Sequence, residues 1–302
     1  MKKIVLITTG GTIAGMGEPG KNTGYVPGAL SPENLPGIPE GIKVKIIPLC
    51  SINSDDITGS HWLRMAEIIN SEAADEETDG IVITHGTDTL EETALFLHLT
   101  AKTDKPVVIT GAMRPVSSLS PDGAGNLSQA FRTACSEKSR GMGVLVVFSD
   151  RIFSAADVTK ESPYSVTAMS GGDRGSMGTV TDNDVIFFHR PARPHTVETE
   201  FRTENISALP KVQVIYFHAD ADPGLLEYAL EHSDGVVIAG AGNGEYSQKF
   251  RKLTEKASVP TVTVSRISGS FMHSPAKAAV LLRLALTVTG DNREIDRIFR
   301  TY

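Results

Sequence analysis

Short runs of apolar residues, rich in Val and Ile, recur along the first half of the chain. They lie at residues 4–7, 44–47, 81–83, 107–109 and 144–148. Near-continuous apolar runs are typical of strands buried on both faces, as in a parallel sheet. Between them apolar residues recur at helical spacing, as at Trp62, Met65 and Ile69. We therefore expect a doubly wound α/β sheet, whose ligands bind beyond the carboxyl ends of the strands.

The alternation is interrupted at residues 187–210, where prolines and polar residues replace the apolar runs. Pro-rich polar segments without periodicity are typical of linkers. The pattern then resumes on a smaller scale, and we expect Ser274 and Asp291 to cap the last two helices. The chain is thus predicted to form a larger N-terminal catalytic domain with a mainly parallel sheet (1–188), a linker (189–210) and a smaller C-terminal α/β domain (211–302).

Composition and charge exclude several classes of function. A length of 302 residues suggests about two domains. There are 36 acidic and 29 basic residues, for a net charge of −7. Phosphate contacts need clustered Lys and Arg, so we expect no nucleic-acid partner. No apolar stretch approaches the roughly 18 residues of a bilayer span, so we expect no membrane partner.

Cysteine and histidine usage bears on cofactors and on the compartment. The chain has 2 cysteines, which excludes a disulfide scaffold, and its histidines lack metal-ligand spacing. We therefore expect no metal and no other cofactor. The apolar run at residues 4–7 is too short for a signal peptide, because Thr and Gly follow it at once. We expect a cytoplasmic protein, or a periplasmic or secreted one if a leader has been removed.

The first predicted strand ends in a glycine turn that contains a threonine. Gly10 and Gly15 fit the outer positions of a dinucleotide-binding fingerprint. Thr12, however, stands where the middle glycine must let the backbone approach a pyrophosphate. A hydroxyl beside backbone N–H groups is instead the material of a nucleophile and an oxyanion hole, with a simple capping role as the alternative.

Further candidate side chains lie beyond the later strands. His85, at the end of the run 81–83, is the histidine best placed for chemistry. Thr87 and Asp88 follow it, although Asp88 also fits a cap of the next helix, whose first turn is acidic. A lone Lys160 is normally a solvated surface charge. It becomes a candidate base only if the fold brings it near a hydroxyl and Asp88, where a desolvated amine can accept a proton.

Two segments resemble the signature motifs of the bacterial L-asparaginases, and most closely those of the type II class. The first covers residues 9–14 (TGGTIA) and the second covers residues 85–93 (HGTDTLEET). Shorter similarities follow in the same order along nearly the whole chain, at residues 111–115, 157–160, 191–193 and 240–244. Two long motifs in the right order make the resemblance specific.

The resemblance implies catalytic roles for five residues. Thr12 would attack the side-chain amide carbon of asparagine and release ammonia, and water would then free aspartate from the acyl-enzyme. Tyr25 would lie beside Thr12. Thr87, Asp88 and Lys160 would form a second group, in which the lysine and the aspartate polarise the threonine hydroxyl. The glycine-rich segment 15–28 would be a lid that excludes water from Thr12.

The resemblance also implies a set of substrate-binding residues, namely Gly11, Ser54, Asp55, Gly86, Thr87, Asp88, Ala112 and Asn243. Ser54 would bind the substrate carboxylate, and Asp55 and Asp88 the amine. The amides of Gly11 and Thr87 would bind the oxyanion. Asn243 would reach the site from a neighbouring subunit. We therefore expect a homotetramer, built as a dimer of dimers with shared active sites.

Two departures from the family pattern concern the substrate amine. Asp55 stands where the family usually has Gln, and the segment between Arg266 and Ser274 is much shorter than usual. That segment normally supplies an acidic residue across the subunit interface. We expect Asp55 to replace this acid, with a solvated loop residue or a helix cap as the alternative. A fixed carboxylate should favour asparagine and leave only minor glutaminase activity.

Two other functions use the same features. An amidase that supplies ammonia to a tRNA-dependent amidotransferase would keep the chemistry, but that role usually needs an additional N-terminal domain. A nucleotide-binding regulatory module would need a glycine at position 12. The sequence therefore favours an amidohydrolase that acts on a free amino-acid amide.

Overall fold

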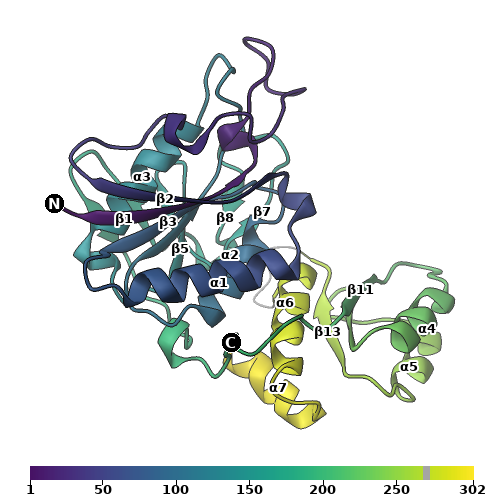
Figure 1. Cartoon of the computed structure of the whole chain (residues 1–302). Coiled ribbons are helices and arrows are strands. Elements are labelled where there is room, and N and C mark those ends of the chain that lie inside the picture. The colour runs from purple at the N-terminus through teal and green to yellow at the C-terminus, as the bar shows by residue number, and fades with distance from the viewer. Residues whose placement is uncertain (268–272) are drawn as a thin grey trace. The chain divides into compact units, whose positions relative to one another are not determined.

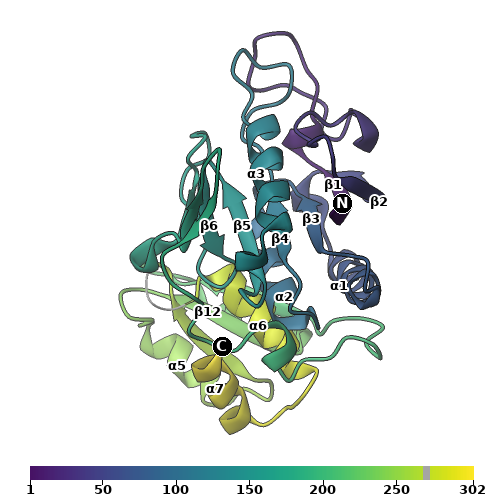
Figure 2. The same ribbon diagram turned by 90° about the vertical axis from the view of Figure 1, so that its left-hand side faces the viewer.

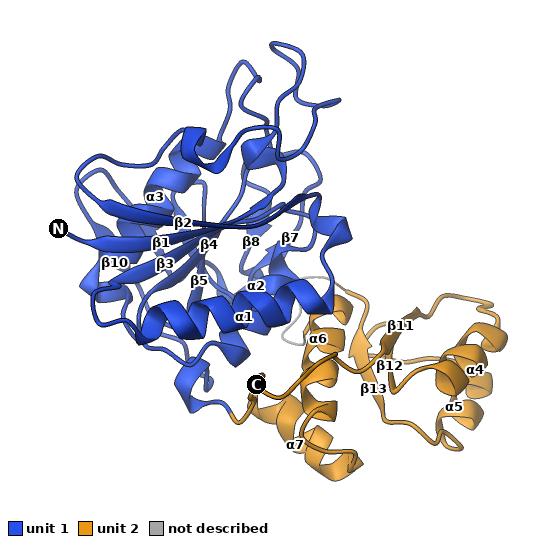
Figure 3. Cartoon of the chain, viewed as in Figure 1, with its two compact units in different colours: residues 1–199 blue, residues 200–302 orange. Residues whose placement is uncertain are grey.

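The polypeptide divides between Thr199 and Glu200 into two units (Figure 3). The computed structural model describes residues 1–267 and 273–302 (Figure 1). Residues 195–199, in the middle of the expected linker, pack onto the first unit, where His195 and Thr199 are buried. Thr199 Oγ1 donates to Leu99 O at 2.6 Å. The domain boundaries at 188 and 211 stay a prediction.

An eight-stranded mixed sheet forms the first unit, in the order β10-β9-β6-β5-β4-β3-β1-β2. Strands β1 to β5 are parallel, whereas β6, β9 and β10 are antiparallel. The strands are β1 (Lys3–Gly10), β2 (Lys43–Ile52), β3 (Gly80–Thr84), β4 (Val107–Thr110), β5 (Val144–Phe148), β6 (Arg151–Ser154), β9 (Gly178–Val180) and β10 (Val185–Phe187). The five strands expected from the apolar runs are present, so the predicted α/β class is confirmed.

Helices cover both faces of this sheet. α1 (Gly59–Ala74) and α2 (Leu90–Thr100) lie on one face, and α3 (Gly123–Cys135) lies on the other (Figures 1 and 2). Ile4 and Leu6 of β1 pack with Phe131 of α3. Successive side chains of a strand point to opposite faces, so Val5 and Ile7 face the other layer, where they are also fully buried. Burial on both sides explains the unbroken apolar runs.

The strand order places three turns next to one another. β1 lies beside β3, and β3 lies beside β4, all three parallel. Their carboxyl ends therefore share one edge of the sheet, which is where ligands bind in open α/β folds. The turns that leave this edge contain residues 10–12, 85–88 and 111–112.

The second unit is a smaller parallel α/β domain, as expected. Strands β11 (Val212–Tyr216), β12 (Gly235–Gly240) and β13 (Thr261–Ser265) form a three-stranded sheet. Its helices are α4 (Pro223–His232), α5 (Gln248–Thr254), α6 (Pro275–Leu286) and α7 (Asn292–Thr301). Both predicted caps are confirmed: Ser274 Oγ accepts from the N–H of Lys277, and the Asp291 carboxylate accepts from the N–H groups of Arg293 and Glu294.

Two further expectations concern membrane-spanning segments and the short segment between Arg266 and Ser274. Within residues 1–267 and 273–302, no helix is both long and apolar enough to cross a membrane. The shortened segment between Arg266 and Ser274 contains residues 268–272, which lie outside the described residues.

Candidate active site

The turns after β1 and β3 touch each other at two glycines. Gly11 has a φ of 73°, and a Cβ atom there would lie 2.7 Å from Gly86 Cα. A Cβ atom on Gly86 would in turn lie 2.9 Å from both Cβ and Oγ of Ser54. Real Cβ atoms do not approach other atoms this closely, so larger residues would force the turns apart. The contact brings together the residues that follow each glycine, Thr12 and Thr87.

Thr12 is the first residue of a 3-10 turn, Thr12–Ala14, and it is 8% exposed. Its Oγ1 lies 2.5 Å from the Tyr25 hydroxyl oxygen. The Tyr25 ring fits because residues 15 and 17 are glycines: a Cβ on Gly15 would lie 2.7 Å from Tyr25 Cδ2. The segment doubles back on itself through a bridge between Met16 and Val26. This fold brings Tyr25 to Thr12.

Thr87, Asp88 and Lys160 form a second connected group. Lys160 Nζ donates to Thr87 Oγ1 at 2.8 Å and to Asp88 Oδ1 at 2.6 Å. The Lys160 side chain is only 14% exposed, so it is not a solvated surface charge. Asp88 contacts the lysine instead of capping α2, which is preceded by Thr89. Lys160 therefore lies near both a hydroxyl and Asp88, which is the condition set for its role in the site.

Ser54 and Ala112 flank these turns. Ser54 is buried, and its Oγ accepts from the N–H groups of Asp88 at 3.2 Å and Thr89 at 3.4 Å. Its own hydroxyl proton can still be donated to a ligand. Ala112 is fully buried just after β4. Ser54 follows β2 and Ala112 follows β4, so both lie at the same edge of the sheet as Thr12 and Thr87.

Asp55 and Asn243 are exposed. Asp55 lies in the 3-10 turn Ser54–Asp56. Thr58, not Asp55, is the N-cap of α1, so the cap alternative for Asp55 is wrong. Asn243 belongs to the second unit, in a turn closed by a bridge between Ala241 and Glu245.

The role expected for the Gly11 amide is contradicted. The N–H of Gly11 donates to Ile52 O at 3.0 Å, because the ladder between β1 and β2 continues to the end of β1. That amide is therefore not available to an oxyanion, and Gly11 contributes through its close approach to Gly86. In the described residues, no acceptor is found for the amides of Thr12 and Thr87. These two amides are the remaining backbone donors of the site.

His85 lies behind the site, not in it. Its ring is fully buried, and Nδ1 lies 2.8 Å from Gly86 O. A carbonyl can only accept, so Nδ1 carries the proton and Nε2 accepts from Thr93 Oγ1 at 3.0 Å. Thr93 Oγ1 accepts in turn from Trp62 Nε1 at 2.8 Å. This chain of bonds fixes the tautomer of His85 and holds the Gly86–Thr87 peptide.

Burial is the main cause that lowers the pKa of His85, to about 4, while its bond to the Gly86 carbonyl acts in the opposite direction. The ring is therefore neutral at pH 7 and serves as a neutral hydrogen-bond donor. A base for the reaction has to come from other residues.

The sequence did not reveal what holds the glycine-rich segment 15–28. Ser117 Oγ accepts from Gly17 N at 3.0 Å, and Ser117 O accepts from Gly20 N at 2.8 Å. Ser118 Oγ donates to Asn22 Oδ1 at 2.5 Å. The one hint in the sequence was the serine-rich loop at residues 116–122, which follows β4. It supports the segment that carries Tyr25.

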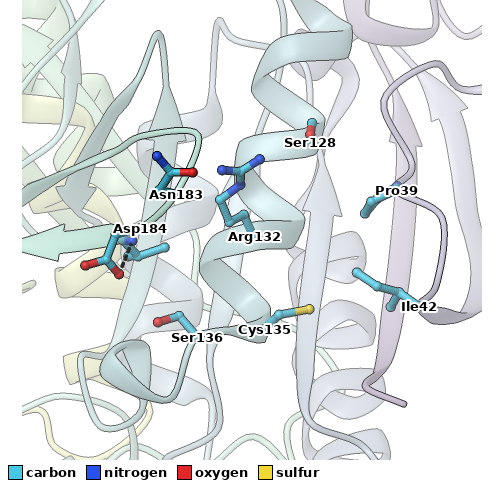
Figure 4. Close-up of a pocket in the computed structure, with 9 residues that line it drawn as sticks. Pro39, Ile42, Ser128, Arg132, Cys135, Ser136, Asn183 and Asp184 are labelled. Atoms are coloured by element: carbon cyan, nitrogen blue, oxygen red, sulfur yellow. Dashed lines mark hydrogen bonds between the residues drawn. The ribbon is translucent and has the colours of Figure 1, made fainter.

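The first unit also has a cavity of about 360 Å³ beside α3 (Figure 4). None of the predicted site residues lines it. Its charged side chains have protein partners: Arg132 donates to Thr181 O, and Asp184 accepts from Lys138. We assign it no function. Across the described ranges, no cluster of His, Cys, Asp or Glu side chains could hold a metal ion.

Hydroxyl groups, a lysine–aspartate pair and amides without a protein acceptor lie together at the carboxyl edge of this α/β sheet, and these are the groups that enzymes use for acyl transfer. Residues 3–193 match the family described as "Asparaginase, N-terminal", and residues 211–274 match the "Glutaminase/Asparaginase C-terminal domain". The chain belongs to the asparaginase family of amidohydrolases. It is therefore a hydrolase whose substrate is an amino-acid amide.

Individual relatives match over nearly their whole length. The chain is 38% identical to L-asparaginase 2 of Escherichia coli, covering 100% of this chain and 94% of that protein. It is 34% identical to a glutaminase-asparaginase of Pseudomonas fluorescens, covering 100% and 91%. A crystal structure of a probable cytoplasmic L-asparaginase from Campylobacter jejuni matches with a TM-score of 0.94 at 36% identity and covers 100% of both chains.

The buried His85 predicts a pH dependence of stability. Its pKa is about 4 in the folded state and about 6.5 in an unfolded chain. Between these values the unfolded state binds more protons, so stability falls as the pH drops from 6.5 towards 4, by about 3 kcal/mol in total. We expect His85→Gln to flatten this dependence, measured as the free energy of unfolding against pH.

The matched control for this prediction is His189→Gln, because His189 is exposed in the same unit. This variant should keep the slope of the wild type. An unchanged slope in His85→Gln would show that His85 does not titrate in this way.

Proposed function

We propose that the protein hydrolyses L-asparagine to L-aspartate and ammonia through an acyl-enzyme on Thr12. The observation that carries the proposal is the pairing of two groups across the Gly11–Gly86 contact. One is Thr12 with Tyr25, and the other is Thr87 with Lys160 and Asp88. The family membership and the relatives named L-asparaginase support the choice of substrate.

In the first half of the reaction, Thr12 Oγ1 attacks the side-chain amide carbon of the substrate. A threonine hydroxyl is a weak nucleophile and needs an acceptor for its proton. The Tyr25 hydroxyl, 2.5 Å away, is in place to relay this proton: its oxygen accepts the threonine proton while its own proton passes to the amide nitrogen, which leaves as ammonia. The negative charge on the tetrahedral intermediate is stabilised by the amides of Thr12 and Thr87, a contribution commonly worth several kcal/mol.

In the second half, water attacks the ester and frees aspartate. Lys160 donates to Thr87 Oγ1, and a hydroxyl that accepts from an ammonium group is a stronger donor. Thr87 is therefore placed to exchange protons with the water and the reacting oxygen. Asp88 balances the charge of the largely covered Lys160, and the contact at 2.6 Å holds Nζ beside Thr87.

The substrate is a zwitterion, and its two charges need opposite partners. We propose that the hydroxyl of Ser54, which lies against Gly86, binds the carboxylate, and that the backbone of Ala112 also lines the substrate site. Asp88 and Asp55 supply negative charge for the ammonium group. We further propose a homotetramer in which Asn243, exposed in its turn, completes the site of a neighbouring subunit. The cytoplasmic location stays a prediction.

The first test of the proposal is Thr12→Ala. We expect this variant to fold and to lose at least about a thousandfold in ammonia release from asparagine, because it lacks the nucleophile. Thr23→Ala makes the same change at an exposed position of the segment 15–28 and should stay active. Near-normal turnover of Thr12→Ala would move the nucleophile elsewhere, to Thr87 in the first place.

The second test concerns Asp55, for which we propose a direct role at the substrate amine. Asp55→Gln should raise the KM for asparagine by about fivefold, since a pair of exposed charges is worth at most ~1 kcal/mol. It should also reduce the preference of the enzyme for asparagine over glutamine, measured as the ratio of their kcat/KM values. Kinetics on both substrates measure this, with Asp56→Asn as the control at the adjacent exposed position. Unchanged KM values for both substrates would show that another group holds the amine.

A further inference from the structure

Glu91 lies in the first turn of α2, and its carboxylate reaches the strand that carries Lys160. Glu91 Oε2 accepts from Thr159 Oγ1 at 2.6 Å and from the backbone N–H of Lys160 at 2.8 Å. Hydrogen bonds to an ionised carboxylate are about twice as strong as those between neutral groups. The N-terminal turn of a helix also stabilises a negative charge. These bonds are therefore a firm attachment between α2 and the strand.

The strand of Lys160 depends on attachments of this kind because its own sheet is very small. β7 (Thr159–Lys160) pairs with β8 (Met169–Ser170) in a two-stranded ribbon that is separate from the eight-stranded sheet. An isolated two-stranded ribbon is at best marginally stable in water. The buried Val158 anchors the start of the ribbon. The bonds to Glu91 then set where the backbone of Lys160 lies beside α2.

Two acidic residues hold the two ends of Lys160. Asp88 accepts from Nζ at 2.6 Å, and Glu91 accepts from the backbone N–H at 2.8 Å. The lysine side chain between these points is flexible, with about 2 kcal/mol of rotamer entropy. Since the backbone end is fixed, only the side chain has to be ordered for Nζ to reach Thr87. Asp88 and Glu91 belong to one short stretch of chain, so the nitrogen of the lysine stays aligned with the turn that carries Thr87.

We propose that Glu91 is a positioning residue for Lys160. It acts through the lysine backbone and does not touch the reacting atoms. The inference rests on the proposed function, because it matters for turnover only if Lys160 takes part in the reaction. Displacing a catalytic group by about 1 Å can cost on the order of a hundredfold in rate. Glu91 is thus expected to affect kcat and to leave the binding of asparagine nearly unchanged.

A double-mutant cycle tests this role. We expect Glu91→Ala to lower kcat for asparagine by about 10- to 100-fold, with KM changed less than about threefold. Glu91→Gln keeps an acceptor oxygen and should stay within about fivefold of the wild type. In a Lys160→Met background, Glu91→Ala should cause no further loss, because residues that act through one another are not additive. Glu92→Ala removes the same charge from the same helical turn and serves as the control.

The outcomes separate this inference from the proposed function. If Lys160→Met keeps its turnover, the proposed role of Lys160 is wrong. If Lys160→Met is slow but Glu91→Ala turns over normally, the positioning role is wrong. An equal loss from Glu91→Ala in both backgrounds would also overturn it, because Glu91 would then act independently of Lys160. Should Glu91→Ala fail to fold, Thr159→Val removes one of the two bonds from the other side and should lower kcat by about threefold.

Discussion

The contact between Gly11 and Gly86 is the constraint on which the rest of the site depends. β1 and β3 are neighbours in a parallel sheet, so their turns leave the same edge, but ordinary side chains would hold the turns apart. Glycine at position 11, with a φ that other residues rarely adopt, lets the two backbones meet, and glycine at position 86 leaves room for Ser54. Thr12 and Thr87, one position further along each turn, become parts of one site.

Each threonine then has its own partner, supplied by a separate part of the chain. Tyr25 reaches Thr12 from the glycine-rich segment, which rests on the loop after β4. Lys160 reaches Thr87 from a small ribbon tied to α2. Neither partner belongs to the eight-stranded sheet. The sheet provides the rigid position of the hydroxyls, and the peripheral segments provide the groups that move protons.

The chain also supports the site from behind without adding charge to it. The neutral ring of His85 donates to the carbonyl of Gly86 and is itself held by Thr93 and Trp62. Since its pKa is about 4, the ring stays neutral at pH 7. A positive charge at this depth would be costly. His85 therefore supports the Gly86–Thr87 peptide without placing a positive charge behind it.

Much of the fold could be predicted because the signals were local. Unbroken apolar runs marked the five parallel strands, and Ser274 and Asp291 marked helix starts through bonds to residues close in sequence. The antiparallel strands β6, β9 and β10 have three or four residues each, too few to show a period. The occupied amide of Gly11 and the bond from Lys160 to Glu91 depend on residues about 40 and 70 positions away. Such contacts leave no local pattern in the sequence.

The central claim is that the acyl group forms on Thr12 while Thr87 and Lys160 assist the reaction. The most direct measurement is to quench the enzyme with acid during turnover of asparagine and to locate the covalent adduct by peptide mass spectrometry. We predict an aspartyl ester on the peptide that contains Thr12, with more of it in Lys160→Met if that variant slows release of the product. An adduct on the peptide that contains Thr87 would contradict the account.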